Sequence, residues 1–354
     1  MSTFVIGYYA LLIGASCLAA YFNKRKIFIL VFSLTMISFI AGIIGGAPAL
    51  RFITTAAGLL ALAAGTSYAF REFLIIITPA GVSKELRTAP LTAAFGMFVI
   101  FTYAIAGVFA PVIAPFGEAQ VISSAFAPPD ETMLLGADQL GRDMFSRIIY
   151  GARNSVGLAL LATMLAFFMG AFAGLLAATK GGWFDQFIGR VADVIMSVPS
   201  LIFALLMLSI FGTNLVVIVI VVAVIYSPRV FRLTRAVAGN VVVMDYIEAA
   251  KLRGEGTWYL IRREILPNST APLIAEFGLE FCFVFLLIAG LSFLGLGIQP
   301  PTADWGSMVR ENATLISFGE MTPLIPAAAI ALLTVAVNFV VDWMLFRSSG
   351  LKEV

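Results

Sequence analysis

The sequence predicts an all-α integral membrane protein, and its composition is the first observation behind that prediction. Hydrophobic residues make up 61% of the 354 positions and charged residues only 12%, whereas a soluble domain carries about 25% charged residues. The second observation is that apolar runs recur along the chain, each close to the roughly 20 residues that a membrane-crossing helix requires. Because a bilayer core offers no water to the backbone, such runs form helices.

Nine spans are expected, because eight apolar runs are long enough to cross and the longest of them is divided by Gly212-Thr213-Asn214. The runs are 1–23, 27–50, 52–70, 88–117, 155–179, 194–228, 271–295 and 321–341.

The distribution of basic residues predicts the orientation of these spans. No Lys or Arg precedes the first apolar run, which argues against a signal peptide, and the cluster Lys24-Arg25-Lys26 follows it. By the positive-inside rule this cluster is cytoplasmic and the N-terminus lies outside. Threading nine spans from there places 17 of the 22 basic residues, Arg229 among them, in the cytoplasm together with the C-terminus.

The composition also argues against other classes of function. Basic residues are spread between the spans rather than massed on one face, which disfavours nucleic-acid binding. The chain has no His, and Cys17 and Cys282 lie inside apolar runs, so no metal site, disulfide framework or catalytic constellation is expected. No Gly-Lys dipeptide occurs, so no P-loop and no bound cofactor is expected, and an intramembrane enzyme is disfavoured.

One charged stretch, 245–268, stands between two apolar runs and is expected to form a helical hairpin. Asp245 followed by Glu248 three positions later resembles a capping box that starts a short helix. Gly254 is expected to end that helix, because glycine adopts the left-handed conformation of a tight turn.

The second half of this stretch predicts another short helix. Thr257 is expected to cap it, with Trp258, Ile261 and Ile265 at helical spacing on one face. Pro267 is expected to block its continuation and redirect the chain.

The hairpin carries a family resemblance. Glu248-Ala249-Ala250, the glycine six positions after Glu248, and Leu266-Pro267-Asn268 resemble the EAA loop of binding-protein-dependent ABC importer permeases. Without the resemblance, the same residues would describe an ordinary basic hairpin at a membrane surface. The resemblance implies that the hairpin docks in a cleft of a separate ATPase subunit. The implied coupling residues are Glu248, Ala249, Ala250, Gly254, Leu266 and Pro267.

A second resemblance lies in the loop 116–153, which is expected to be external. Its residues 135–147 are similar to the family segment Gly-Thr-Asp-x-x-Gly-Arg-Asp-x-x-Ser-Arg, with Ala137 in place of threonine. Two roles remain open: a gate or docking feature facing a solute-binding protein, or a rigid loop held by Asp–Arg pairs, which we favour. The motif residues are Gly136, Asp138, Gly141, Arg142, Asp143, Ser146 and Arg147.

Residues 291–308 resemble the signature of the dipeptide/oligopeptide/nickel permease class, with Asp304 where a small polar residue is usual. Such permeases have six spans and a cytoplasmic N-terminus, and residues 88–354 reproduce both. The resemblance therefore implies a six-span permease domain at 88–354 with a cytoplasmic coupling loop at 229–270. Residues 1–87 form an accessory region of about three extra spans.

Two acids and a proline within the expected spans are candidates for the translocation pathway. Glu276 and Glu280 lie i,i+4 on one helix face. They either line a polar path that attracts a cationic part of the solute, or pair with Arg262, Arg263 or a partner subunit. Pro199 is expected to kink its span and free a carbonyl toward the path.

Together the resemblances imply the permease subunit of an ATP-driven importer in a bacterial cytoplasmic (inner) membrane. The implied partners are the lipid bilayer, a homologous second permease, two ABC ATPase subunits that bind ATP and Mg²⁺, and an extracytoplasmic solute-binding protein. The solute stays open between a dipeptide, an oligopeptide, a nickel chelate and another small molecule. The alternative is a self-sufficient transporter driven by protons or sodium, which would use Glu276 and Glu280 but predicts repeated halves that the sequence lacks.

Overall fold

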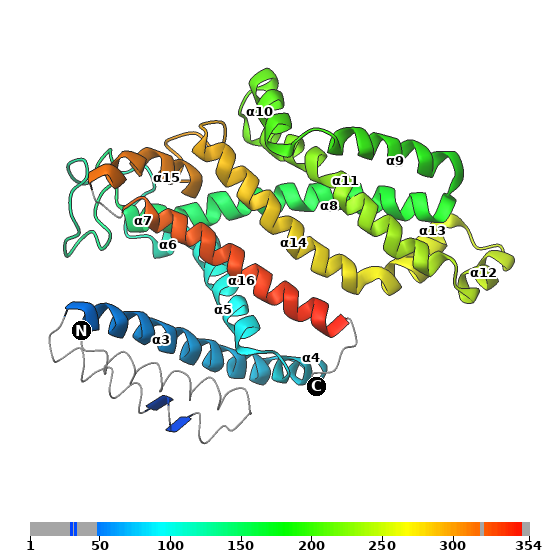
Figure 1. Cartoon of the computed structure of the whole chain (residues 1–354), viewed down its shortest axis with the longest axis horizontal. Coiled ribbons are helices and arrows are strands. Elements are labelled where there is room, and N and C mark those ends of the chain that lie inside the picture. Colours follow the sequence, from blue (N-terminus) through cyan, green and yellow to red (C-terminus); the bar gives the residue numbers. More distant parts are fainter. Residues whose placement is uncertain (1–28, 31, 34–47, 319–321, 349–354) are drawn as a thin grey trace. The chain divides into compact units, whose positions relative to one another are not determined.

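The computed structural model describes residues 29–30, 32–33, 48–318 and 322–348 (Figure 1). The predicted span at 1–23 and most of the one at 27–50 lie outside the described residues. Contacts divide the chain into two compact units, Met1–Phe95 and Gly96–Val354.

Within the described ranges the fold is all helical, apart from two isolated β-bridges that join Val121 to Arg142 and Ala137 to Asp143. This confirms the predicted fold class. The elements are α3 (Pro48–Ile77), α4 (Ala80–Arg87), α5 (Leu91–Val108), α6 (Ala110–Ile113), α7 (Met144–Gly151), the π-helical turn η1 (Ala152–Val156), α8 (Gly157–Lys180), α9 (Gly182–Met196), α10 (Ser200–Phe211), α11 (Leu215–Val242), α12 (Asp245–Leu252), α13 (Thr257–Tyr259), the π-helical turn η2 (Leu260–Ile265), α14 (Leu266–Phe293), α15 (Trp305–Asn312), the 3₁₀ helix η3 (Ala313–Phe318) and α16 (Leu324–Ser348).

Six described helices are long and apolar enough to cross a membrane: Gly58–Ile77, Leu91–Val108, Met144–Lys180, Leu215–Val242, Thr257–Phe293 and Leu324–Arg347. The pair α9 and α10 passes the same test together but bends by 87° at its break. Counting this pair as one span gives seven, which correspond to the third to ninth predicted spans. The predicted sixth span is therefore not a kinked helix but a broken one, since α10 has only 12 residues.

The most extensive packing between two helices of the second unit joins α8 to α11, which lie side by side (Figure 1). Helix α9 packs against both. Gly170 and Gly174, one turn apart on α8, face the backbone of α11. A Cβ on Gly170 would lie 2.4 Å from the Ser227 carbonyl oxygen, and one on Gly174 would lie 2.8 Å from that of Phe231. Two glycines at this spacing let helix backbones approach closely, as membrane helices favour.

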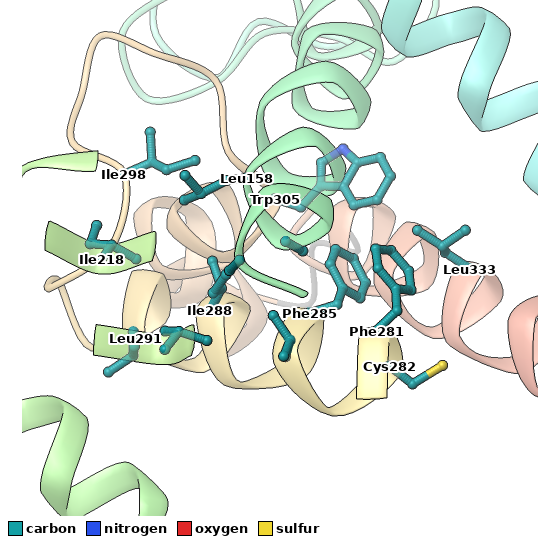
Figure 2. Packing of buried hydrophobic residues seen from close by; sticks show 14 of the residues in the cluster. Leu158, Ile218, Phe281, Cys282, Phe285, Ile288, Leu291, Ile298, Trp305 and Leu333 are labelled. Atoms are coloured by element: carbon teal, nitrogen blue, oxygen red, sulfur yellow. The ribbon is translucent and has the colours of Figure 1, made fainter. Parts of the chain in front are cut away.

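A hydrophobic core joins α8, α11, α14, α15 and α16, and it extends along most of α14 and α16 (Figure 2). Trp305 at its centre is fully buried, and its indole Nε1 donates a hydrogen bond to the Ile148 carbonyl at 3.0 Å. Its ring meets Phe285 and Tyr103 edge to face, with centroids 6.1 and 5.2 Å apart. This packing fixes α15, and with it the polar loop described below, on the ends of the spans.

Candidate functional site

The first candidate site is the hairpin α12–η2, which stands at the opposite end of the second unit from α15 (Figure 1). Helix α12 begins at Asp245, but Met244 occupies the cap position in extended conformation and no side chain caps the helix. The predicted capping box is therefore wrong. Asp245 and Glu248 instead lie in the first helical turn, where their charges complement the positive end of the helix dipole.

The predicted end of α12 is confirmed. Gly254 has a φ of +84°, and its N–H donates to the Lys251 carbonyl at 2.9 Å. The next N–H, of Glu255, donates to the Ala250 carbonyl at 3.2 Å. This pair of bonds is a Schellman motif, and it closes the helix with a left-handed glycine.

Helix α12 is attached to the rest of the chain along one face only. Ile247 and Ala250 are fully buried in a cluster with residues of α8, α11 and η2. Glu248, Ala249 and Gly254 are exposed, and the Leu252 side chain is 85% exposed. Of the residues implied to couple to an ATPase, Ala250 thus anchors the helix, whereas its neighbours are open to a partner.

The second half of the hairpin differs from the prediction. Gly256, not Thr257, stands at the cap of α13, and η2 then joins α13 to α14 in one 37-residue helical span. Pro267 does not end this helix, because it lies in the first turn of α14, directly after a π-helical turn. The proline is tolerated within the continuous helix because the π-helical turn before it departs from the regular α-helical hydrogen-bond pattern.

The predicted apolar face of this segment is only partly correct. Ile261 and Ile265 are buried, but Trp258 is 61% exposed. Leu266 and Pro267 are exposed as well.

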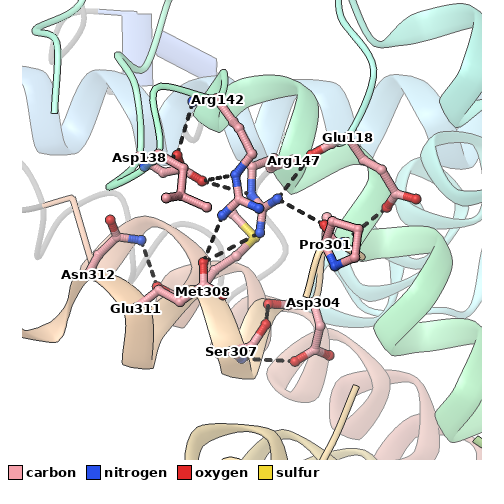
Figure 3. Close-up of polar contacts among 12 residues, drawn as sticks. Glu118, Asp138, Arg142, Arg147, Pro301, Asp304, Ser307, Met308, Glu311 and Asn312 are labelled. Carbon is pink, nitrogen blue, oxygen red and sulfur yellow. Dashed lines mark hydrogen bonds and ion pairs between the residues drawn. The ribbon is translucent and has the colours of Figure 1, made fainter. Parts of the chain in front are cut away.

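The second candidate site is the loop 116–153, whose centre is a buried charge cluster (Figure 3). Asp138 Oδ2 lies 2.7 Å from Arg142 Nε and 3.2 Å from Arg147 Nε. Glu311 of α15 meets the same two arginines, its Oε2 lying 3.1 Å from Arg142 Nη2 and 3.6 Å from Arg147 Nη2. All four side chains are almost completely buried, so the cluster ties the loop to α15.

The remaining motif residues shape the backbone around this cluster. Asp143 caps α7, since its Oδ2 accepts from the Ser146 N–H at 2.7 Å and from its hydroxyl at 2.6 Å. Gly136 and Gly141 have φ values of +71° and +76°. A Cβ on Gly141 would lie 2.0 Å from the Ser123 carbonyl oxygen.

The structure thus contains the Asp–Arg pairs that a rigid loop requires, and all seven motif residues participate in holding it. Any contact of this loop with a solute-binding protein stays a prediction, and it would fall to the exposed residues around the cluster.

Sequence reasoning missed the acidic partners of this loop. The Glu118 carboxylate accepts from the Ala303 N–H and from Asn154 Nδ2, both at 3.0 Å. Asp304 accepts from the Ser155 hydroxyl at 2.7 Å and from the Ser307 N–H at 2.9 Å, and so caps α15. Burial raises the pKa of the Asp304 carboxyl. An acid three positions before Ser307 is a capping signal, which was available in the sequence.

The third candidate site lies inside the spans. Arg229 Nε is 3.4 Å from Glu280 Oε1, and each residue stands at the middle of a 28-residue helix, α11 and α14 respectively. Arg229, predicted as the first residue of the coupling loop 229–270, therefore lies within helix α11 instead. Of the alternatives left open for Glu280, the structure shows pairing with Arg229 and not with Arg262 or Arg263. The apolar run predicted from the sequence ends at Pro228, but helix α11 continues for 14 residues beyond this proline.

The break between α9 and α10 belongs to the same neighbourhood. Pro199 caps α10, and the next residue, Ser200, interacts with the Tyr226 hydroxyl. That hydroxyl also donates to the Phe283 carbonyl at 3.1 Å. Arg229 lies over the rings of both aromatics, 5.6 Å from the Tyr226 centroid and 4.6 Å from that of Phe283.

Ser200, next to Pro199, and Glu280 thus both interact with side chains of α11, Tyr226 and Arg229 respectively. Neither α11 residue was predicted from the sequence as a site residue. Glu276, one turn before Glu280 on α14, is half-buried, and the charge of Arg229 acts on it as well.

Comparison with known proteins matches residues 170–348, from the middle of α8 to the end of α16, to the family described as "binding-protein-dependent transport system inner membrane component". The chain is 34% identical over 254 residues to a di/tripeptide transport system permease protein of Pseudomonas aeruginosa, covering 70% of this chain and 84% of that one. It is 33% identical over 260 residues to a dipeptide transport system permease protein of Alkalihalophilus pseudofirmus, covering 73% and 85%. It is 33% identical over 257 residues to a glutathione transport system permease protein of Pectobacterium atrosepticum, covering 71% and 84%.

Proposed function

Because the chain belongs to the family of binding-protein-dependent transport system inner membrane components, we propose that it is the permease subunit of an ATP-driven importer of peptide-like solutes. Three relatives that match over most of their length are named for di- and tripeptides, dipeptides and glutathione. Their shared chemical class is the observation that supports a peptide-like solute.

The transport cycle requires partners that supply energy and solute. This chain and a homologous second permease form the pathway between them. Two ABC ATPase subunits bind ATP and Mg²⁺ on the cytoplasmic side of the membrane. An extracytoplasmic binding protein delivers the solute from the other side. The exposed side of α12 supports the ATPase contact, because four apolar side chains are exposed on and next to this helix: Val243, Met244, Tyr246 and Leu252.

The orientation follows from the same contact. Helix α12 lies in the cytoplasm, the loop 116–153 and α15 lie outside, and the chain begins outside and ends in the cytoplasm. The basic residues Lys251, Arg253, Arg262 and Arg263 around the hairpin support this placement. Residues 88–354 form the permease domain, and residues 1–87 form an accessory membrane region.

Coupling then works through the buried face of α12. Ile247 and Ala250 are packed against α8, α11 and η2, so a displacement of α12 by the ATPase moves the ends of these helices. Because packed helices are bistable rather than continuously deformable, the spans rock as bodies. This motion alternates access to a pathway that includes Pro199, Glu276 and Glu280.

The experiment that tests the coupling role compares two substitutions of Gly254 in the reconstituted importer. No described atom lies within 4 Å of a Cβ at this position, although its φ of +84° strains any side chain equally. Gly254→Ala therefore tests strain alone, whereas Gly254→Arg adds bulk and charge to the docking face. We expect Gly254→Ala to retain most ATP-driven peptide uptake and Gly254→Arg to abolish it, with both proteins inserted normally.

Normal uptake by Gly254→Arg would contradict the coupling role. Equal loss in both variants would assign the defect to the turn rather than to the docking face.

A further inference from the structure

The guanidinium of Arg229 is an unusual group for its position. The 14 residues of α11 that precede it carry no charge, and it is the first of three arginines along the helix. The next two, Arg232 and Arg235, pair closely with Asp193 and Asp185 of α9. A charged side chain at this depth is costly, and such residues face a water-filled cavity or the interior of the helix assembly. Yet the Arg229 side chain is 45% exposed on the surface of this chain.

Glu280, the counter-ion of Arg229, pairs with only part of the guanidinium. Glu280 approaches Nε at 3.4 Å, and neither of its carboxylate oxygens accepts a hydrogen bond from the described residues. Glu280 is fully buried, whereas the outer part of the arginine is open. The guanidinium lies over the rings of Tyr226 and Phe283. No described residue accepts a hydrogen bond from its remaining N–H groups, which leaves them open to a ligand.

The break between α9 and α10 is an independent sign that the surface around Arg229 is polar. The backbone between α9 and α10 is non-helical at residues 197–199, where the two helices bend by 87° within one apolar segment. This break is exposed on the chain, and Ser200 at its end contacts Tyr226. Irregular backbone at membrane depth occurs only where it is buried in protein or lines an aqueous cavity.

We infer that Arg229 binds the carboxylate of the transported solute, with Glu276 positioned to receive its ammonium group. This inference rests on the proposed function, which makes the solute peptide-like. A guanidinium fork matches a carboxylate with two parallel hydrogen bonds, and Glu280 then acts as the resting counter-ion that the solute replaces. No covalent step is involved.

The test uses the complete importer in proteoliposomes, supplied with its binding protein and a pool of di- and tripeptides in free-acid and C-terminally amidated forms. Uptake of each form is measured by mass spectrometry, and the acid-to-amide ratio is the readout. The same binding protein serves every variant, so its own preference cancels in the comparison. Removing Arg229 alone would leave Glu280 as an uncompensated buried charge, so the variant is the double substitution Arg229→Gln with Glu280→Gln.

The matched control neutralises the neighbouring pair, Arg232 on α11 and Asp193 on α9, as Arg232→Gln with Asp193→Asn. This pair shares α11 with Arg229 but joins it to α9 rather than to α14, and it is half-exposed and hydrogen-bonded. We expect the Arg229 double variant to lower the acid-to-amide ratio by about tenfold or more, and the control to leave it unchanged. A single Glu280→Gln variant retains Arg229 and is expected to keep the preference for the acid.

An unchanged ratio in the Arg229 double variant, with ATP-driven uptake intact, would overturn the inference and leave the proposed function standing. A wild-type importer that takes up none of the peptides would overturn the proposed function itself, and the inference with it.

Discussion

At the scale of single residues, the described chain uses buried charges in two different ways. In the loop 116–153, Asp138 and Glu311 hydrogen-bond to Arg142 and lie within ion-pair distance of Arg147, so each buried charge has an opposite charge beside it. Asp304 nearby has no basic partner at bonding distance within the described residues, and only hydroxyl and amide donors stabilise its carboxylate. Its role is therefore to cap α15 at the cost of a buried charge.

This cost gives a pH-dependent prediction for Asp304. Burial raises the pKa of the folded-state carboxyl above its ordinary value of 3.8, so the folded protein binds the proton more tightly than the unfolded chain. The buried carboxylate lowers the free energy of unfolding by its full amount above the folded-state pKa of Asp304. This loss of stability disappears as the pH falls toward 3.8. We expect Asp304→Asn to be more stable relative to wild type near neutral pH than at pH about 4.

Thermal unfolding of the detergent-solubilised protein across this pH range measures the difference. Asp304→Ala is the companion variant, since it also removes the cap and should be destabilised by about 1–2 kcal/mol. A stability difference between wild type and Asp304→Asn that does not vary with pH would contradict this account.

At the scale of elements, close contact between α8 and α11 is what assembles the second unit. We expect Gly170→Ala to destabilise the protein by about 1–3 kcal/mol, because the added methyl group must displace either the α11 backbone or Val230. Gly157→Ala on the same helix is the control, since no described atom lies within 4 Å of its Cβ. Melting temperatures of the two variants make the comparison, and equal stability would show that the helices do not depend on this contact.

The sequence predicted most elements because their causes are local. Apolar length predicted the spans, and a glycine in a left-handed turn predicted the end of α12. What failed depended on tertiary context: Met244 took the cap position, and a π-helical turn allowed the chain to continue through Pro267. The 87° break at Pro199 was predicted only as a kink, because the sequence does not reveal how α10 contacts α11.

At the scale of the whole molecule, the three candidate sites are spread along the length of the helices of the second unit. Helix α12 stands at one end and α15, to which the charge cluster of the loop 116–153 is bound, at the other (Figure 1). The Arg229–Glu280 pair lies halfway along α11 and α14. Motifs in the sequence predicted the sites at the two ends, the hairpin α12–η2 and the loop 116–153. The pair was missed because Arg229 and Glu280 are 51 positions apart, and only the packing of α11 on α14 brings them together.

The central claim, that this chain is driven by separate ATPase subunits through α12, is tested most directly by purification of the intact complex from its native membrane in mild detergent. Leu252→Asp changes the most exposed apolar side chain of the hairpin, and Leu140→Asp makes the same change at a half-exposed leucine of the loop 116–153. We expect an ATP-hydrolysing subunit and a second permease to co-purify with wild type and with Leu140→Asp, and the ATPase to be lost from Leu252→Asp. A chain that purifies without any ATPase activity, yet supports peptide uptake driven by an ion gradient, would contradict the account.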